Sequence, residues 1–366
     1  MRKERKADSN RIFSGIAVFF IVLTVLAAGS FVLKLALDKP VESVPAMSVD
    51  LPAVTTAAPV QTSATAETSL PVTSSETEIA VPVFVTPHRT EASKELDKEF
   101  DAGNAVLFNA ENGEIIAYRG ETQRMFPASL TKVMTLIVAV ENIPDLDDKV
   151  TITDDMVRPM IELDASRAGF EPGETPTLRD VLYGMILSSG ADAALAAAEY
   201  VAGSEEKFVE LMNEKAADMG LECTHFTNVS GLHDTDHYST ASDMGTILSY
   251  AYGIDLCREF LSAVEYTIPP TEQNPEGLPQ TSTLFSRMYG DEMPGVTVLG
   301  GKTGYTDEAR HCVECFADAD GRTLILVIAG SHTKWNAIYD TLSILSVYGV
   351  GGEKYQPDDN NKEQKN

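Results

Sequence analysis

The chain has 366 residues, of which 43% are hydrophobic and 23% are charged, proportions that are typical of a globular protein with one large domain or two small ones. Its 55 acidic residues outnumber the 28 basic ones, which gives a formal net charge of −27. This charge argues against nucleic acid as a partner, because a protein that follows phosphates needs a basic surface. Four cysteines are too few for a scaffold built on disulfides.

An uncharged stretch near the N-terminus, residues 12–33, is long enough for a helix that crosses a bilayer core of about 30 Å. Residues 1–11 hold five basic residues against two acidic ones, a bias that keeps such a segment cytoplasmic. The sequence therefore predicts a basic cytoplasmic tail over residues 1–11, a single-pass signal anchor in the cell membrane over residues 12–33, and an extracytoplasmic remainder. A cleaved signal peptide is the alternative, since small residues occur at 27–30, but its apolar core would normally be shorter.

Residues 34–95 are rich in Pro, Thr, Ser, Ala, Val and Glu. Such a composition cannot bury enough apolar surface to offset its ordering entropy, so we predict a disordered linker. At the other end, residues 353–366 form a polar tail without an apolar face. Residues 96–352 are left as the folded domain.

This domain is expected to open with two short strands, because apolar runs at 105–108 and 114–118 flank an Asn-Gly pair that favours tight hairpin turns. Helical and strand-like patterns follow. The helices are expected at 130–141, 178–200, 205–219, 242–252 and 335–348, and the later strands at 297–300, 311–317 and 323–329. Strands at both ends with helices between them predict an α/β (α+β layered) fold, in which an antiparallel sheet flanked by helices is split by a helical insertion.

Three Ser-x-x-Lys patterns occur, beginning at Ser129, Ser204 and Ser331. Residues three apart share a helix face, so the lysine amine can reach the serine hydroxyl. Ser204 and Ser331 precede predicted helices and are expected to be N-caps. Ser129 differs, because a proline two residues earlier fits a helix start and the apolar residues 133–140 would bury the rest of that helix. It is the candidate nucleophile.

The chain holds one Lys-Thr-Gly triplet, Lys302-Thr303-Gly304, after a predicted strand. It is not a phosphate-binding loop, because the upstream glycine that the G-x-x-x-x-G-K-[ST] pattern requires is missing. Alone, the triplet favours a plain strand edge. Its position after a helical Ser-x-x-Lys pattern and a helical insertion indicates a function.

In this order the motifs resemble the serine-type D-alanyl-D-alanine carboxypeptidases, the low-molecular-mass penicillin-binding proteins. The resemblance rests on residues 127–135 and 302–306, extends to residues 182–194 and 224–241, and covers essentially all of residues 96–350. It implies a β-lactamase/transpeptidase-like fold and an enzyme that removes the terminal D-Ala from peptidoglycan stem peptides ending in D-Ala-D-Ala. It also implies acylation by β-lactam antibiotics, and neither a cofactor nor a metal.

The resemblance assigns the proton-transfer roles to three residues. Ser129 would be the nucleophile, Lys132 its general base and Ser189 the proton relay to the departing amine. A free lysine has a pKa of about 10.4, so Lys132 can accept a proton at neutral pH only if burial and a second cation lower its pKa. Lys302 would be that second cation.

The resemblance also assigns the substrate contacts. Lys302 and Thr303 would hold the terminal carboxylate, for which an ammonium and a hydroxyl are suitable partners. Gly304 completes the motif, and the backbone N–H groups of Ser129 and Tyr305 would form the oxyanion hole.

One position departs from the family. Its middle motif is Ser-x-Asn, whereas the aligned residues here are Ser189, Gly190 and Ala191, and no Ser-x-Asn or Tyr-x-Asn occurs in the chain. The asparagine of the family links the lysine to the substrate backbone, and alanine cannot. If nothing replaces it, a rate loss of about 10²-fold is expected. Asp192 follows directly but is expected to point elsewhere.

Two alternative functions stay open. Ala191 also fits a catalytically weak or silent homologue that binds the wall or senses β-lactams. A serine β-lactamase would share the fold, and rapid deacylation of benzylpenicillin would indicate it.

Two further groups of residues have the chemistry of metal ligands. His225, His233 and His237 are not accompanied by a carboxylate cluster, so we expect them to be parts of a loop. Cys312 and Cys315 are three apart on a predicted strand, so their side chains face opposite sides and cannot share an ion.

Overall fold

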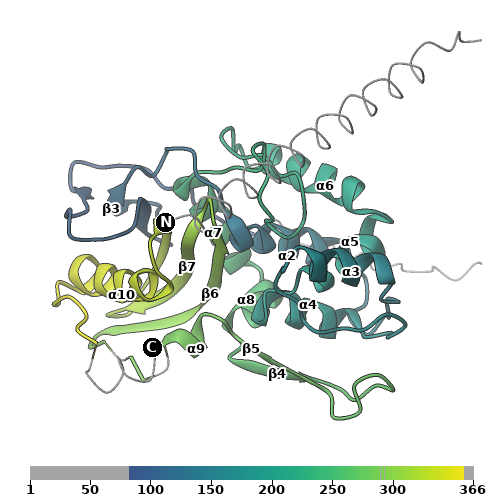
Figure 1. The fold of residues 1–366 in the computed structure, drawn as a ribbon. Helices are drawn as coiled ribbons and strands as arrows, with labels where there is room; N and C mark the ends of the chain where they lie inside the picture. The colour runs from purple at the N-terminus through teal and green to yellow at the C-terminus, as the bar shows by residue number, and fades with distance from the viewer. Residues whose placement is uncertain (1–81, 289, 292, 358–366) are drawn as a thin grey trace, which may run out of the picture. The chain divides into compact units, whose positions relative to one another are not determined.

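The computed structural model describes residues 82–288, 290, 291 and 293–357 (Figure 1). The predicted basic tail and anchor lie outside the described residues, as do most of the linker and the end of the polar tail. Among the helices of the described residues, none is long and apolar enough to cross a membrane.

A six-stranded sheet forms the centre of the described domain, with the strand order β1-β3-β2-β8-β7-β6. The strands are β1 (Lys94–Glu95), β2 (Asn104–Asn109), β3 (Ile115–Arg119), β6 (Val296–Thr306), β7 (Arg310–Ala319) and β8 (Arg322–Ser331). β1 pairs in parallel with β3, and the other neighbours pair antiparallel. Because β2 pairs with β8, strands from the two ends of the domain form one sheet, as the sequence predicted, and they meet in its middle.

Helices cover both faces of the sheet (Figure 1). On one face lies α10 (Lys334–Ile344), continued by the π-helical turn η2 (Leu345–Val350). The other face carries most of the segment between β3 and β6. Its elements are η1 (Ala128–Leu130), α2 (Thr131–Asn142), α3 (Asp154–Glu162), α4 (Leu178–Leu187), α5 (Ala191–Ala202), α6 (Glu205–Asp218), α7 (Ala241–Gly253), α8 (Asp255–Ser262), β4 (Glu265–Ile268), β5 (Leu278–Thr281) and α9 (Phe285–Met288). Met288 on α9, at the end of this segment, packs instead in the core with α10.

The alternation of side chains along the strands separates two hydrophobic cores. On β2, Val106 and Phe108 join the core with α2 and α4, whereas Ala105 and Leu107 join the core with α10. The sheet is therefore buried on both faces. The expected fold class, an α/β sheet flanked by helices with a helical insertion, is confirmed.

The prediction of one helix over residues 178–200 is wrong, because this segment forms two helices. α4 ends at Leu187, α5 begins at Ala191, and Ser189 lies between them with φ = 59°. This left-handed backbone conformation is uncommon for a residue other than glycine. The apolar pattern runs through the break, so periodicity alone could not reveal it.

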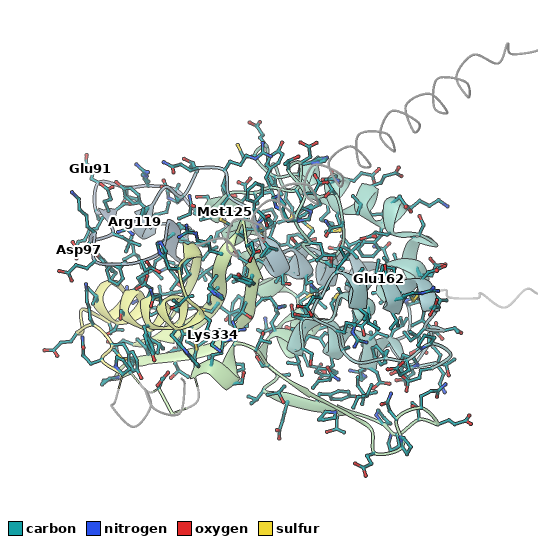
Figure 2. The ribbon with its side chains drawn as sticks, in the orientation of Figure 1. Glu91, Asp97, Arg119, Met125, Glu162 and Lys334 are labelled. Atoms are coloured by element: carbon teal, nitrogen blue, oxygen red, sulfur yellow. The ribbon has the colours of Figure 1, made fainter. Side chains whose placement is uncertain are left out.

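Ordered contacts begin before residue 96, within the segment that the composition assigned to the linker. β1 lies there, and Arg89 forms an ion pair with Glu121 at 2.6 Å. The link between β1 and β2 is held by Arg119 at the end of β3, which donates to carbonyl oxygens of this segment, including that of Asp97 (Figure 2). These contacts fix the outer edge of the sheet.

Candidate active site

Ser129 and Lys132 lie side by side where η1 passes into α2. Nζ of Lys132 donates hydrogen bonds to Oγ of Ser129 at 3.1 Å and to the carbonyl oxygen of Ser230 at 2.6 Å. Lys132 is 2% exposed, and this burial lowers its pKa to about 7, an effect that the charge of Asp192 opposes. About half of the Lys132 amines are therefore neutral near pH 7, as a general base requires.

The turn that presents Ser129 depends on a close backbone contact. Ala128 has φ = 49°, and a Cβ added to Gly231 would lie 1.8 Å from the Ala128 carbonyl oxygen. Only glycine fits at 231. The side chain of Asn228 accepts hydrogen bonds from the N–H groups of Ser230 at 3.2 Å and Gly231 at 2.7 Å. This loop therefore brings the Ser230 carbonyl to Lys132.

Ser189 and Lys302 form a second pair opposite the first. Nζ of Lys302 donates to Oγ of Ser189 at 2.9 Å and to the carbonyl oxygen of Thr303 at 2.9 Å. Burial, then the charges of Lys132 and Arg287, hold the pKa of Lys302 well below its usual value, and Glu314 opposes them. The break between α4 and α5 is what allows the Ser189 side chain to reach this lysine.

The strand β6 is longer than predicted, so Lys302, Thr303 and Gly304 lie within it rather than after it. A Cβ added to Gly304 would lie 3.0 Å from the backbone nitrogen of Ser129 and 3.1 Å from the Pro127 carbonyl oxygen. A glycine here lets β6 pass close to η1. The backbone of Ser129 is thereby placed beside Gly304, one residue before Tyr305.

A cavity of about 530 Å³ opens over these groups. Its walls come from η1 and α2, the break before α5, the loop before α4, the loop after α6, α9 and β6. The predicted residues that line it are Ser129, Lys132, Ser189, Thr303, Gly304 and Tyr305. Lys302 lies beneath the wall, 1% exposed. The structure therefore brings all seven predicted site residues together.

Arg287 and His311 are two residues of the cavity with ionisable side chains that the sequence analysis did not single out. Arg287 on α9 lines it, and no hydrogen bond or ion pair is recorded for this guanidinium among the described residues. His311 on β7 lines it too, and its ring stacks on Tyr305 with centroids 4.4 Å apart. A four-residue helix has no periodicity, and a single histidine on a strand carries no signal, so neither could have been found by pattern.

Ala191 lines the cavity at the start of α5, where the family carries its asparagine. The carboxylate of Asp192 instead accepts hydrogen bonds from the N–H groups of Ala168 at 2.7 Å, Gly169 at 3.2 Å and Ala193 at 2.9 Å. It holds the loop before α4, so the prediction that it points elsewhere is confirmed. Within the part of the chain that is described, no side-chain amide lines the cavity.

The serines of the other two Ser-x-x-Lys patterns, Ser204 and Ser331, do not line this cavity. Ser204 is the N-cap of α6, as predicted, and accepts from the Lys207 N–H at 3.3 Å. The cap predicted at Ser331 is wrong, because this residue ends β8 and Thr333 caps α10. The strand continues to residue 331 because it pairs there with His311 on β7.

The metal-ligand candidates form no metal site, since no suitable cluster of His, Cys, Asp or Glu exists among the described residues. Nε2 of the buried His237 is 2.8 Å from Oγ1 of Thr131, and burial lowers its pKa to about 4. This neutral ring supports the start of α2. Cys312 and Cys315 face opposite cores, as predicted.

A serine beside a buried lysine, with a second serine and a Lys-Thr-Gly strand across the same cavity, defines a serine hydrolase of the penicillin-binding type. Comparison with known proteins supports this class. Residues 89–333 match the Peptidase_S11 family, described as D-alanyl-D-alanine carboxypeptidase. The match covers more than half of the chain. The chain therefore belongs to this family of serine-type peptidases.

Among curated relatives, the chain is 33% identical over 237 residues to the D-alanyl-D-alanine carboxypeptidase DacF of Bacillus subtilis. It is also 33% identical over 247 residues to DacC of Escherichia coli. Each match covers 64% of this chain, but only 58% and 57% of those relatives. The chain thus spans less than two thirds of their length.

The solved structures agree. The crystal structure of the Streptomyces K15 DD-transpeptidase matches with a TM-score of 0.60 and 28% identity, over 67% of this chain and 96% of that one. The carboxypeptidase DacD of Francisella tularensis matches with a TM-score of 0.58 at 24% identity, over 68% and 70% of the two chains, which supports the fold alone.

Proposed function

We propose that this chain is a membrane-anchored serine D-alanyl-D-alanine carboxypeptidase that removes the terminal D-Ala from peptidoglycan stem peptides. The observation that carries the proposal is one cavity in which Lys132 contacts Ser129 at 3.1 Å and Lys302 contacts Ser189 at 2.9 Å. The family membership supplies the reaction class.

Acylation begins when the neutral amine of Lys132 takes the proton of Ser129, whose Oγ attacks the carbonyl carbon between the two D-alanines. The N–H groups of Ser129 and Tyr305 stabilise the oxyanion. Ser189, hydrogen-bonded to Lys302, relays to the departing nitrogen the proton that Lys132 took up, so Lys132 is neutral again and Ser189 keeps its hydroxyl. The peptide bond breaks, free D-alanine leaves, and an ester to Ser129 remains.

Deacylation reverses the proton transfers. Lys132 takes a proton from a water molecule, which attacks the ester, and Ser129 regains its hydroxyl as the shortened stem peptide leaves. A β-lactam would acylate the same serine by opening of its ring. Because its leaving nitrogen stays tethered, the ester would persist longer.

The substrate carboxylate would bind at the far side of the cavity. Lys302 and Thr303 are the groups expected from the motif, and Arg287 adds a guanidinium that lines the same space. Charge-assisted hydrogen bonds to a carboxylate are about twice as strong as neutral ones. This end of the cavity therefore favours a peptide with a free C-terminus.

The anchor belongs to the proposal as well. Residues 12–33 would hold the chain in the cell membrane, and residues 34–81 would let the peptidase domain reach the wall outside.

The alternative is a silent homologue that binds β-lactams without turnover, and Ala191 favours it, because the cavity lacks the amide that the family uses. A serine β-lactamase is the less favoured second alternative.

One assay separates these functions. Wild type and the Ser129→Ala variant are incubated with a stem peptide that ends in D-Ala-D-Ala, and released D-alanine is measured. Ser204→Ala, which removes a serine from a rival pattern, is the matched control. Release by wild type and Ser204→Ala alone supports the carboxypeptidase. Binding of penicillin without release supports the silent homologue, and rapid hydrolysis of benzylpenicillin supports the β-lactamase.

A further inference from the structure

Glu314, in the middle of β7, is a buried acid that the mechanism above does not use. It is the direct cross-strand neighbour of Lys302 on β6. Side chains that are directly paired across antiparallel strands lie on the same face. On β7, Phe316 lies in the core with α2, whereas Val313 and Cys315 lie in the core with α10. Glu314 therefore lies on the face of the catalytic lysines.

Within the described residues this carboxyl group makes neither a hydrogen bond nor an ion pair, so only the charge of Lys302 on the neighbouring strand can compensate it. Glu314 is 0% exposed, and neither of its side-chain oxygens has a hydrogen-bond partner within the described part of the chain. An isolated buried carboxylate is costly, so a buried acid is normally hydrogen-bonded or paired with a cation. Burial raises the pKa of Glu314 well above its usual value, and the charge of Lys302 is the one influence among the described residues that opposes this rise.

The other catalytic lysine has an equivalent acid. The charge of Asp192 acts on Lys132, and three backbone N–H groups hold that carboxylate in place. The cluster thus contains two buried lysines, each with one buried acid beside it. Glu314 differs from Asp192 because no backbone donor compensates it, so its charge state depends on Lys302.

Four titratable groups surround this pair. Lys132 on α2 and Arg287 on α9 act on Lys302, and the charge of Glu314 acts on the thiols of Cys312 and Cys315 on β7. Burial raises the pKa of both thiols to about 12, so they are neutral. The two other cations lower the pKa of Lys302, and Glu314 is the one group that raises it.

We propose that Glu314 is a positioning residue of this active site, whose carboxylate is the counter-charge that keeps the Lys302 ammonium protonated against Ser189. This inference rests on the proposed function, because it concerns how Lys302 supports the proton relay and binds the substrate carboxylate. It assigns a role to a residue outside the Ser-x-x-Lys and Lys-Thr-Gly motifs.

The test is the pH dependence of Ser129 acylation by a fluorescent penicillin in Glu314→Gln. Loss of the carboxylate lowers the pKa of Lys302, so Lys302 loses its proton at a lower pH. We expect the alkaline limb of the acylation rate to move down by about one pH unit, which makes acylation about tenfold slower on that limb. Glu314→Asp, which keeps the charge, should restore most of the wild-type profile.

Glu174→Gln is the matched control. Glu174 is a buried acid, 2% exposed, that accepts a hydrogen bond from Asn274 at 2.9 Å beside the β4–β5 hairpin, away from the lysines. It should leave the pH profile unchanged. If Glu314→Gln does not fold, Glu314→Leu replaces the acid with an apolar group of similar size and should shift the limb in the same direction.

Three results are decisive. A shifted alkaline limb in Glu314→Gln or Glu314→Leu, but not in Glu174→Gln, supports the inference. A profile that superimposes on wild type overturns it and leaves Glu314 as an inert protonated core acid, while the proposed function stands. Absence of Ser129-dependent labelling in the wild type overturns the proposed function and this inference together.

Discussion

The proposed mechanism gives the two buried lysines of this site opposite tasks. Lys132 must lose its proton to activate Ser129, whereas Lys302 must keep its proton to hold a carboxylate. Burial lowers the pKa of both, and each amine donates to one serine hydroxyl and one carbonyl oxygen. The two lysines differ in their charged neighbours: Asp192 raises the pKa of Lys132, whereas Lys132 and Arg287 lower that of Lys302 and Glu314 raises it.

The fall of the acylation rate at acidic pH should reflect protonation of Lys132. Its pKa of about 7 means that the amine is protonated, and cannot accept the Ser129 proton, below that pH. Acylation by a fluorescent penicillin at about pH 6 should therefore run at about one tenth of its plateau rate. Lys207→Ala, which removes the exposed lysine of a rival pattern, should show the same fall. A rate that is independent of pH across this range would contradict the assignment.

The missing amide at position 191 can be restored. In Ala191→Asn the side chain would enter the cavity beside Ser189 and Lys132, where the family uses it to bind the substrate backbone. We expect D-alanine release to rise by about tenfold or more, because one hydrogen bond made in the transition state is worth this much.

Ala191→Leu is the control for side-chain size, because leucine is about as large as asparagine but has no amide to form a hydrogen bond. It should not gain activity. Equal rates for Ala191→Asn and wild type would mean that another group already replaces the asparagine.

At the scale of elements, the site depends on how closely β6 approaches η1. Gly304→Ala would place a Cβ 3.0 Å from the Ser129 nitrogen and 3.2 Å from the Ala128 Cβ, so the strand must move away. We expect acylation to slow about tenfold or more, with little change in the melting temperature, because β6 is an edge strand.

A second glycine tests whether slower acylation in Gly304→Ala comes from the close contact at Gly304 or from any glycine-to-alanine change. A Cβ added to Gly103 would meet nothing closer than 3.6 Å, so Gly103→Ala should acylate at the wild-type rate. If Gly304→Ala is also unaffected, the close approach of β6 has no part in aligning the oxyanion hole.

The order of the short motifs predicted the residues of the candidate site. Hydrophobic periodicity predicted the bounds of the surrounding helices and strands less well. Ser129, Lys132 and Lys302 could be singled out from the sequence because short local patterns carry them, and the structure brings them together. Ser189 was expected within a helix, because the apolar pattern around it does not reveal its left-handed backbone or its contact with Lys302. Arg287 was missed because only tertiary structure brings its four-residue helix to the cavity.

For the whole molecule, the proposed anchor makes a separate prediction. The full chain should remain with the membrane fraction after alkaline carbonate extraction. Leu23→Arg with Leu26→Arg should release it, because each charge at a helix centre costs about 2.5–3.5 kcal/mol of insertion free energy. A wild-type chain found in the soluble fraction, or cleaved near residue 30, would contradict the anchor and support a signal peptide.

The central claim is that Ser129 carries the acyl group, and mapping that group by mass spectrometry tests it most directly. The chain is treated with benzylpenicillin, digested, and searched for the added mass on peptides that contain Ser129, Ser204 or Ser331. We predict one acyl group, on the Ser129 peptide, and none on this peptide in Ser129→Ala. An acyl group on either rival serine, or none at all, would contradict the account.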